Sequence, residues 1–170
     1  MNSTTSNSAV QEPAPREASS EGFYSADCYN MQESVGLLLK RTYQSMMRSV
    51  DERMQVYDLT AMQWTPLFLI AKGYDTVAGC ARHSNIDASS MTRMLDRLEA
   101  KSLIRRVRSA TDRRVVNIEL TESGRHIADQ IPRELAWVLN RHLRGFSAEE
   151  FDTLKNLLHR FEANGTPEEV

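Results

Sequence analysis

Hydrophobic positions recur at helical spacing along most of the chain and at strand spacing over one short stretch. Residues 29–57 are predicted to form a long first helix, because apolar side chains repeat there every three or four positions. The residues on this face are Val35, Leu38, Leu39, Thr42, Met46 and Val50. Three shorter helices are predicted over residues 61–72, 76–83 and 87–101, with Thr60 and Asp87 as N-caps. Pro66 predicts a kink or a weak first turn in the second helix.

The period then changes from helical to alternating. Residues 103–108 and 115–120 are predicted as two strands of a hairpin, joined by a loop over residues 109–114. Thr121 is expected to cap a helix that continues to about residue 144. Ser147 and Glu150 have the spacing of a capping box and predict a last helix that ends near residue 163.

The third and fourth predicted helices are separated only by residues 84–86, which predicts a helix-turn-helix followed by a β wing. The fold class is therefore mostly α with a small β wing. The outer helices have apolar faces that need cover, and a second copy of the same helices would supply it. The predicted divisions are a disordered tail (1–26), a first dimerisation helix (27–58), a winged helix-turn-helix DNA-binding domain (59–120), C-terminal dimerisation helices (121–164) and a tail (165–170).

Charge is distributed unevenly along this chain, whose net charge is −2 over 170 residues. Residues 82–114 hold nine Lys and Arg against four acids, whereas residues 146–170 hold six acids against two bases. A basic segment that covers a helix and a hairpin suits duplex DNA, since the helix fits the major groove and a ribbon arginine can enter the minor groove.

Several other classes of protein are disfavoured. No apolar run approaches the roughly 18 residues of a membrane span, and no secretory signal is evident, so a cytoplasmic location is expected. The sequence has no cysteine–histidine spacing typical of a metal site, and no nucleophile elbow, phosphate loop or paired carboxylates. We therefore predict a protein that is not an enzyme and that has no metal and no cofactor.

The fourth helix is the predicted recognition helix. Polar side chains expected to contact DNA lie around it, at Ser89, Ser90, Thr92, Arg93 and Arg97. Arg93 has the chemistry to make two hydrogen bonds to a guanine. The alternative for both arginines is an ion pair within the helix, with Asp96 or Glu99. On the first strand, phosphate contacts are expected from Arg105, Arg106 and Arg108.

These segments resemble the MarR (multiple antibiotic resistance regulator) family. The resemblance is most specific over residues 98–124, where a basic strand, Asp112-Arg113-Arg114, an apolar strand and the sequence LTESG follow one another; LTAMQW (59–64) adds to it. It implies a dimeric regulator, usually a repressor, on a pseudo-palindromic operator, which a small and often aromatic acid releases. It also implies that Asp112 supports Arg114 in the minor groove and that Arg113 makes a phosphate or alternate contact. The alternative is a hairpin tip with solvated arginines.

An effector site is expected where the first two helices meet the winged domain. Arg41 would supply the cation, and the run LLLKRTYQ (37–44) resembles the branch of the family that responds to aromatic ring acids. The other candidate residues are Tyr43, Met62, Trp64, Phe68 and His83. Alternatively, the second-helix side chains are plain core, and Arg41 pairs with an acid of the partner subunit.

Two further alternatives remain open. One is a redox-sensing regulator of the same fold that uses Cys28, which has Tyr24 and Tyr29 as neighbours. Peroxide sensitivity that disappears in Cys28→Ser would distinguish it. The other is a winged helix that binds protein, and a steep loss of DNA binding with added salt would argue against that.

Overall fold

The computed structural model describes residues 22–108 and 116–165 of the chain. Contacts divide the chain into two units, residues 1–40 and residues 41–170, and the helix α1 (Val35–Met54) runs from the first into the second. None of the described helices is both long and apolar enough to cross a membrane.

The described part of the first unit consists of two 3-10 helices and the start of α1. The helices η1 (Ala26–Cys28) and η2 (Met31–Glu33) precede α1, so the predicted start of the first helix at residue 29 is wrong. The Asn30 side chain accepts a hydrogen bond from the Gln32 amide, at 3.0 Å. Ser34 is extended, with φ −68° and ψ 141°. Because both local side chains favour turns over continuous helix, the regular helix begins at Val35.

The second unit contains the remainder of α1 and then a short 3-10 helix, η3 (Gln55–Tyr57). Asp58 follows in the left-handed region with φ 54°, which ends the helical run. The next helix, α2 (Trp64–Ala71), starts three residues later than predicted, and Thr60 does not cap it. The Asp51 side chain accepts from the Ala61 amide at 2.5 Å and holds residues 61–63 in a turn. Pro66 therefore lies in the first turn of α2, where its missing amide hydrogen costs nothing.

The predicted helix-turn-helix is confirmed. It consists of α3 (Val77–Ser84) and α4 (Ala88–Ala100). Thr76 caps α3 by accepting from the Gly79 amide, and Asp87 caps α4 by accepting from the Ser90 amide. Between them Asn85 takes the left-handed conformation (φ 52°), which turns the chain sharply.

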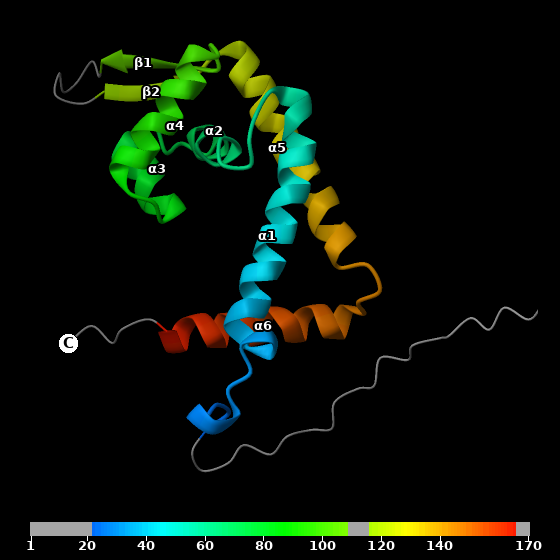
Figure 1. Ribbon diagram of the computed structural model, residues 1–170. Helices are drawn as coiled ribbons and strands as arrows, with labels where there is room; N and C mark the ends of the chain where they lie inside the picture. The colour runs from blue at the N-terminus through cyan, green and yellow to red at the C-terminus, as the bar shows by residue number, and fades with distance from the viewer. Residues whose placement is uncertain (1–21, 109–115, 166–170) are drawn as a thin grey trace, which may run out of the picture. The chain divides into compact units, whose positions relative to one another are not determined.

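The predicted hairpin is present as β1 (Ile104–Arg108) and β2 (Val116–Leu120), which pair in antiparallel fashion with Ile104 opposite Leu120 and Arg106 opposite Ile118. Figure 1 shows the hairpin extending beside α4. The Ile118 amide also donates to the Asp75 carbonyl, at 2.7 Å. Residue 75 thus joins the sheet by one hydrogen bond, which the sequence pattern did not predict.

Two helices complete the unit, α5 (Glu122–His142) and α6 (Ala148–Gly165). Thr121 caps α5, and the capping box of α6 forms in both directions between Ser147 and Glu150. The core of the winged domain is built from side chains of α2, α4, β1, β2 and α5, including Leu67, Met91, Leu95, Leu98, Ile104, Ile118 and Ile131. By contrast, α6 has no buried residue.

Candidate nucleic-acid interface

One side of α4 is buried and the opposite side presents polar residues. Met91, Leu95 and Leu98 are fully buried against the winged domain. Ser89, Arg93 and Arg97 follow one another at intervals of four residues, so they share a face, and all three are exposed. The helix therefore presents a polar face of the length that recognition helices place in a groove.

The hydroxyl groups at the start of α4 are already hydrogen bonded. Ser89 Oγ donates to Asp87 Oδ1 at 2.5 Å, and the Ser90 amide donates to the same oxygen at 2.8 Å. Thr92 Oγ1 donates to the Ala88 carbonyl at 2.8 Å. The serine side chains and the Ser90 amide lower the pKa of Asp87 well below its ordinary value. A hydroxyl that donates to the protein keeps its lone pairs, so the Ser89 hydroxyl can still accept a hydrogen bond.

The two arginines of this face do not make the intrahelical ion pairs that were the alternative to DNA contact. Within the described part of the chain, Asp96 and Glu99 both pair with Arg106 of β1. Arg93 and Arg97 have no ion pair to a described residue and extend from an exposed surface. Their charges are therefore available to a polyanion.

The three arginines of β1 have different environments. Arg105 pairs across the hairpin with Glu119, with its Nη2 2.7 Å from Oε2, and both side chains are largely exposed. Arg108 is exposed at the end of β1. Arg106 is held by two carboxylates of α4. Arg105 and Arg108 are exposed enough for a phosphate contact, for which Arg105 would exchange Glu119, whereas Arg106 is held between two carboxylates and is largely shielded.

The predicted wing-tip residues Asp112, Arg113 and Arg114 lie outside the described residues, and their assignment rests on the sequence alone.

The base of the wing is fixed by hydrogen bonds, close packing and an ion pair that involve residues 101–103 and 121–124. The Thr121 hydroxyl donates to the Ser102 carbonyl at 2.8 Å and accepts from the Gly124 amide at 3.0 Å. Gly124 packs so closely on Leu103 that a Cβ built there would be 1.9 Å from the Leu103 carbonyl oxygen. At the end of α4, Lys101 forms an ion pair with Asp58 and also donates to its carbonyl. These contacts join the hairpin, α4 and α5 into one body.

The structure brings together only part of the predicted effector site. The rings of Trp64 and Phe68 meet edge to face, with centroids 6.3 Å apart. Trp64 Nε1 is buried and has no hydrogen-bond partner among the described residues. Lys72, which the sequence reasoning missed, lies 5.2 Å above the Phe68 ring. Its position four residues after Phe68 on a helix was the signal that could have identified it.

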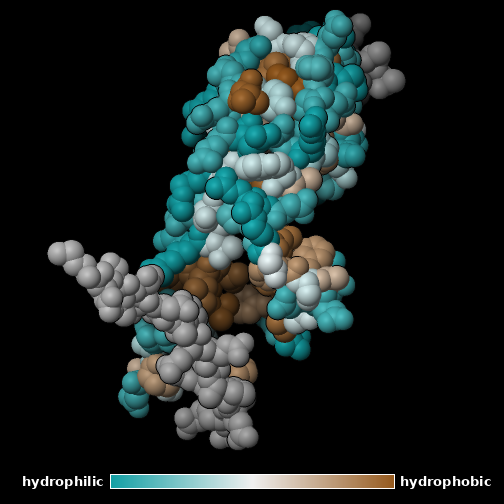
Figure 2. All heavy atoms as spheres, turned by 90° about the vertical axis from the view of Figure 1, so that its right-hand side faces the viewer, coloured by the Kyte–Doolittle hydropathy of each residue, from teal (hydrophilic) through white to brown (hydrophobic). Residues whose placement is uncertain are grey.

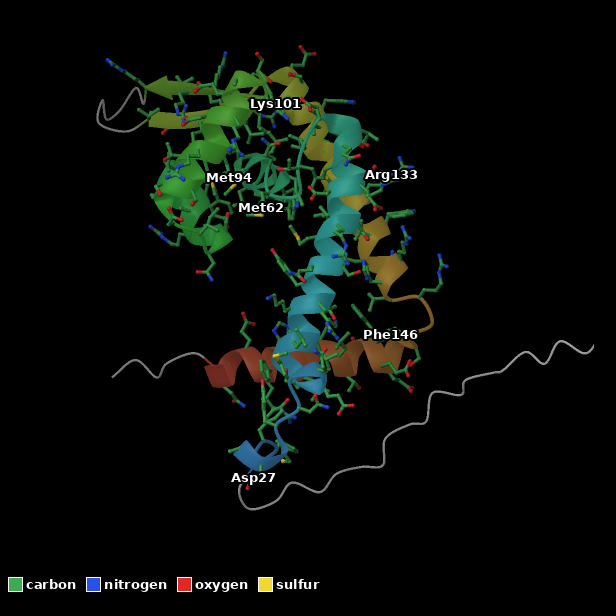
Figure 3. The ribbon with its side chains drawn as sticks, viewed as in Figure 1. Asp27, Met62, Met94, Lys101, Arg133 and Phe146 are labelled. Carbon is green, nitrogen blue, oxygen red and sulfur yellow. The ribbon has the colours of Figure 1, made fainter. Side chains whose placement is uncertain are left out.

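The remaining predicted effector residues lie on the surface. Tyr43 and Met62 are exposed, and Figure 3 shows Met62 beside α2. His83 is exposed and contacts Tyr74, with ring centroids 3.8 Å apart. Its aromatic partner therefore lies in the segment that precedes α3. Arg41 is exposed on α1 and is engaged within the protein.

The two cysteines differ in accessibility. Cys28 is exposed in η1, and its Sγ lies 2.9 Å from Ser25 Oγ. Cys80 is buried in α3 and donates to the Tyr74 carbonyl at 3.0 Å. Burial, assisted by the charge of Asp75, raises the pKa of Cys80 to about 11. Since the thiolate is the reactive form, both burial and the raised pKa disfavour reaction of Cys80 at neutral pH.

Comparison with known proteins gives one family and a consistent group of structures. Residues 59–116 match the model of the MarR family. A mutant of MarR from E. coli, complexed with operator DNA, is 28% identical, with a TM-score of 0.69 over 78% of this chain and 99% of that one. BpsR from Bordetella bronchiseptica, whose DNA binding is regulated by 6-hydroxynicotinic acid, is 25% identical, with a TM-score of 0.70 over 79% of this chain and 96% of that one. MepR from S. aureus, complexed with DNA, has a TM-score of 0.72 at 22% identity over 78% of this chain and 99% of that one, a likeness of fold alone.

Proposed function

This chain belongs to the MarR family of DNA-binding regulators, and from that premise we propose that it is a dimeric repressor that binds a pseudo-palindromic operator and is released by a small aromatic acid. The observation that carries the DNA-binding part is the exposed face of α4. Ser89, Arg93 and Arg97 line it, and Arg106 neutralises the two acids beside it.

The chemistry of this face fits base recognition followed by backbone anchoring. Ser89 is near the N-terminus of α4, where recognition helices meet base edges. Arg93 stands one turn later, with a planar fork of donors that matches guanine. Arg105 and Arg108 extend the positive charge along β1, in a position to contact phosphates on the flanking backbone. By the family resemblance, Arg114 makes the minor-groove contact, Asp112 supports Arg114, and Arg113 makes a phosphate or alternate contact.

The assignment of Arg114 is testable with one substitution. Arg114→Ala should weaken binding to the operator about tenfold or more, about 1.4 kcal/mol, because a wing arginine in the minor groove is lost. The measurement is a gel-shift titration at fixed salt on a duplex that the wild-type protein has selected from a random pool. Arg133→Ala, which removes an exposed arginine of α5, is the matched control and should bind like wild type. Equal affinities of Arg114→Ala and wild type would remove Arg114 from the interface.

Dimerisation is supported by the apolar surface of α6. Phe151, Leu157, Leu158 and Phe161 are all exposed on this helix, Phe161 to 55%. A groove of about 540 Å³ runs beside them, lined by Leu154 and Leu157 and by polar residues of the first turns. Figure 2 shows strongly apolar surface at the level of α6. Side chains of this size stay exposed at a cost in free energy that a second copy would remove.

The effector proposal rests on the aromatic pair of α2. Trp64 and Phe68 offer apolar ring surfaces that meet edge to face, Trp64 Nε1 is a buried donor without a partner among the described residues, and Lys72 offers a cation. Arg41 and Tyr43 of α1, Met62 and His83 complete the proposed set. An aromatic carboxylate uses all three kinds of group. The regulation of BpsR by 6-hydroxynicotinic acid supports this class of compound.

Isothermal titration with a panel of benzoate and pyridine carboxylates tests the effector proposal. A binding compound should also release the selected duplex, and Trp64→Phe should weaken that compound while keeping the ring wall. If no compound produced heat and none altered DNA binding, the proposal of an aromatic acid effector would be wrong.

A further inference from the structure

Arg106 occupies an unusual place for a basic residue, on the core-facing side of the hairpin. It lies two residues after Ile104 on β1, so the two side chains share a face of the strand, and it lies opposite Ile118 of β2. Both isoleucines are buried. Directly opposite residues of an antiparallel pair lie on the same face of the sheet. The Arg106 side chain is 28% exposed, against 68% for its neighbour Arg105. Arg106 therefore points toward α4 and not toward solvent.

Two acids of α4 hold Arg106 in this place. Its Nη2 lies 2.6 Å from Asp96 Oδ1, and its Nη1 forms an ion pair with Glu99. The Arg106 backbone amide donates to the other oxygen of Glu99, at 3.2 Å. Asp96 and Glu99 are three residues apart, so they lie on one side of the helix. One strand residue thus grips one turn of the recognition helix through both its side chain and its backbone.

The position of this grip along β1 matters for the wing. The root of the hairpin is fixed by hydrogen bonds of Leu103, whose amide donates to the Leu98 carbonyl and whose carbonyl accepts from the Thr121 amide. Arg106 adds a second attachment, three residues further along the chain. A strand that is attached at two separated points has a fixed direction relative to the rest of the domain, whereas a strand attached at one point can pivot there. The bonds of Arg106 therefore define how the outer part of β1 is directed relative to α4.

We propose that Arg106 is a positioning residue, which locks the wing to the recognition helix and thereby contributes to discrimination between operator and other DNA without itself contacting phosphate. This inference rests on the proposed DNA-binding function. A protein that contacts one groove with a helix and the next with a wing loses less conformational entropy on binding if the two elements are already held at the right separation. Arg106 also keeps the charges of Asp96 and Glu99 from opposing the phosphates.

The sharpest test removes the partners of Arg106 and leaves the arginine in place. In Asp96→Asn/Glu99→Gln, two negative charges near the DNA disappear, so simple electrostatics predicts stronger binding to all duplexes. Loss of positioning predicts instead that the ratio of affinities for a selected duplex and a scrambled duplex falls roughly tenfold, the size of one lost base-pair contact. The selected duplex is the one that wild-type protein enriches from a random pool.

Three single substitutions on β1 complete the design, and Arg106→Gln, which removes the charge of Arg106, is one of them. Arg106→Lys keeps the charge but loses the planar fork, and it should lower the same ratio at an unchanged thermal unfolding midpoint. Arg108→Gln is the matched comparison for a phosphate contact: it should weaken both duplexes alike and reduce the slope of log K against log salt by about one ion. Circular dichroism verifies that each variant is folded.

The positioning role of Arg106 and the proposed DNA-binding function would be overturned by different results. An unchanged affinity ratio in both Asp96→Asn/Glu99→Gln and Arg106→Lys would overturn the positioning role, as would an Arg106→Gln variant that loses affinity and salt slope in the manner of Arg108→Gln. A wild-type protein that enriches no duplex would overturn the proposed function itself, and this inference with it.

Discussion

The start of α5 requires a residue without a side chain at position 124. Gly124 lies against the Leu103 carbonyl, and an added Cβ would come within 1.9 Å of its oxygen and 2.9 Å of its carbon. Both are backbone atoms, which cannot rotate away. Gly124→Ala should therefore lower the free energy of unfolding by about 2 kcal/mol or more, since overpacking forces the backbone to shift.

Urea denaturation followed by circular dichroism measures this effect. Gly36→Ala is the matched control, because a Cβ at Gly36 in α1 meets nothing within 4 Å and alanine favours helix. It should leave stability unchanged or raise it by up to about 1 kcal/mol. Equal stabilities of Gly124→Ala and wild type would show that the start of α5 moves freely relative to Leu103.

The charge of Asp87 should make the stability of α4 depend on pH. Hydrogen bonds from Ser89 and Ser90 lower its pKa in the folded protein below the unfolded value, which is about 3.9. The stabilisation is therefore complete above that unfolded value and is lost as pH falls toward the folded pKa. Asp87→Asn keeps an N-cap acceptor but has no charge, so it isolates this contribution.

Thermal unfolding of wild type and Asp87→Asn from pH 7 to pH 3 tests the linkage. The variant should unfold at a lower temperature at pH 7, and the difference should shrink below about pH 4. Asp129→Asn, an exposed acid of α5, is the control and should show no such trend. A difference of constant size across the range would contradict the charge-based account.

Sequence reasoning succeeded for residues whose role is local. Asp87, Thr121 and the pair Ser147 and Glu150 were predicted as caps, and each makes the predicted hydrogen bonds. A cap depends mainly on the next three residues, so most of its signal is contained in the sequence. Thr60 is the exception: it does not cap α2, because Asp51 of α1 holds the Ala61 amide. The pairing of Arg106 with Asp96 and Glu99 was not predicted, because these partners belong to another element. Their pairing depends on the angle between strand and helix, which no local pattern contains.

At the scale of elements, the boundaries that sequence reasoning missed were set by distant contacts. The start of α2 depends on Asp51 of α1, which holds the Ala61 amide. The hydrogen bond from Ile118 to the Asp75 carbonyl links the wing to the segment before α3. A single residue in an extended segment has no alternation to recognise. The long helices and the hairpin were predictable because their apolar side chains repeat at a regular spacing over many residues.

The end of α1 is joined to the middle of α5 by a largely buried carboxylate. Glu134 is only 6% exposed and accepts from Arg53 Nε at 2.6 Å and from the Tyr57 hydroxyl at 3.1 Å. Arg53 also lies over the Trp137 ring, at 4.6 Å from its centroid. Burial, followed by the hydrogen bond to Glu134, raises the pKa of Tyr57. This cluster is a polar link between the two helices, in addition to the contact between Ser49 Oγ and His142 Nε2 at 3.4 Å.

Glu134→Ala should lower the free energy of unfolding by about 2 kcal/mol, because two hydrogen bonds are lost and Tyr57 is left without its acceptor. The effect should stay below that of a fully buried pair, since the Arg53 side chain is 40% exposed and water can solvate its charge. Chemical denaturation measures it, with Asp129→Ala as a surface control that changes stability by less than about 0.5 kcal/mol. A loss no greater than that of the control would mean that the cluster contributes nothing to holding α1 on α5.

At the scale of the whole molecule, the sequence predicted two kinds of apolar surface, and the described residues distinguish them. The stripe of α4 is buried in the winged domain, whereas that of α6 is left uncovered. Figure 3 labels Phe146 in the bend between α5 and α6, and this residue is also half exposed. Both helices have the same apolar periodicity, so periodicity reveals that a face needs cover but does not reveal whether the cover comes from the same chain.

A substitution in the middle of the α6 face tests whether a second copy covers it. Leu157 is 48% exposed and lines the groove on this helix. In Leu157→Glu, a buried charge would oppose association, so the proposed dimer should dissociate into folded monomers, as measured by light scattering after size exclusion. Because each subunit of the proposed dimer would read only half of a palindrome, affinity for the selected duplex should fall roughly tenfold or more. Asn156→Glu adds the same charge on the opposite side of α6 and should leave both mass and affinity unchanged, since 100° per residue places position 156 away from the apolar stripe. If Leu157→Glu remained dimeric, the interface would have to lie elsewhere, and if it became monomeric with full affinity, dimerisation and operator binding would be independent properties of this chain.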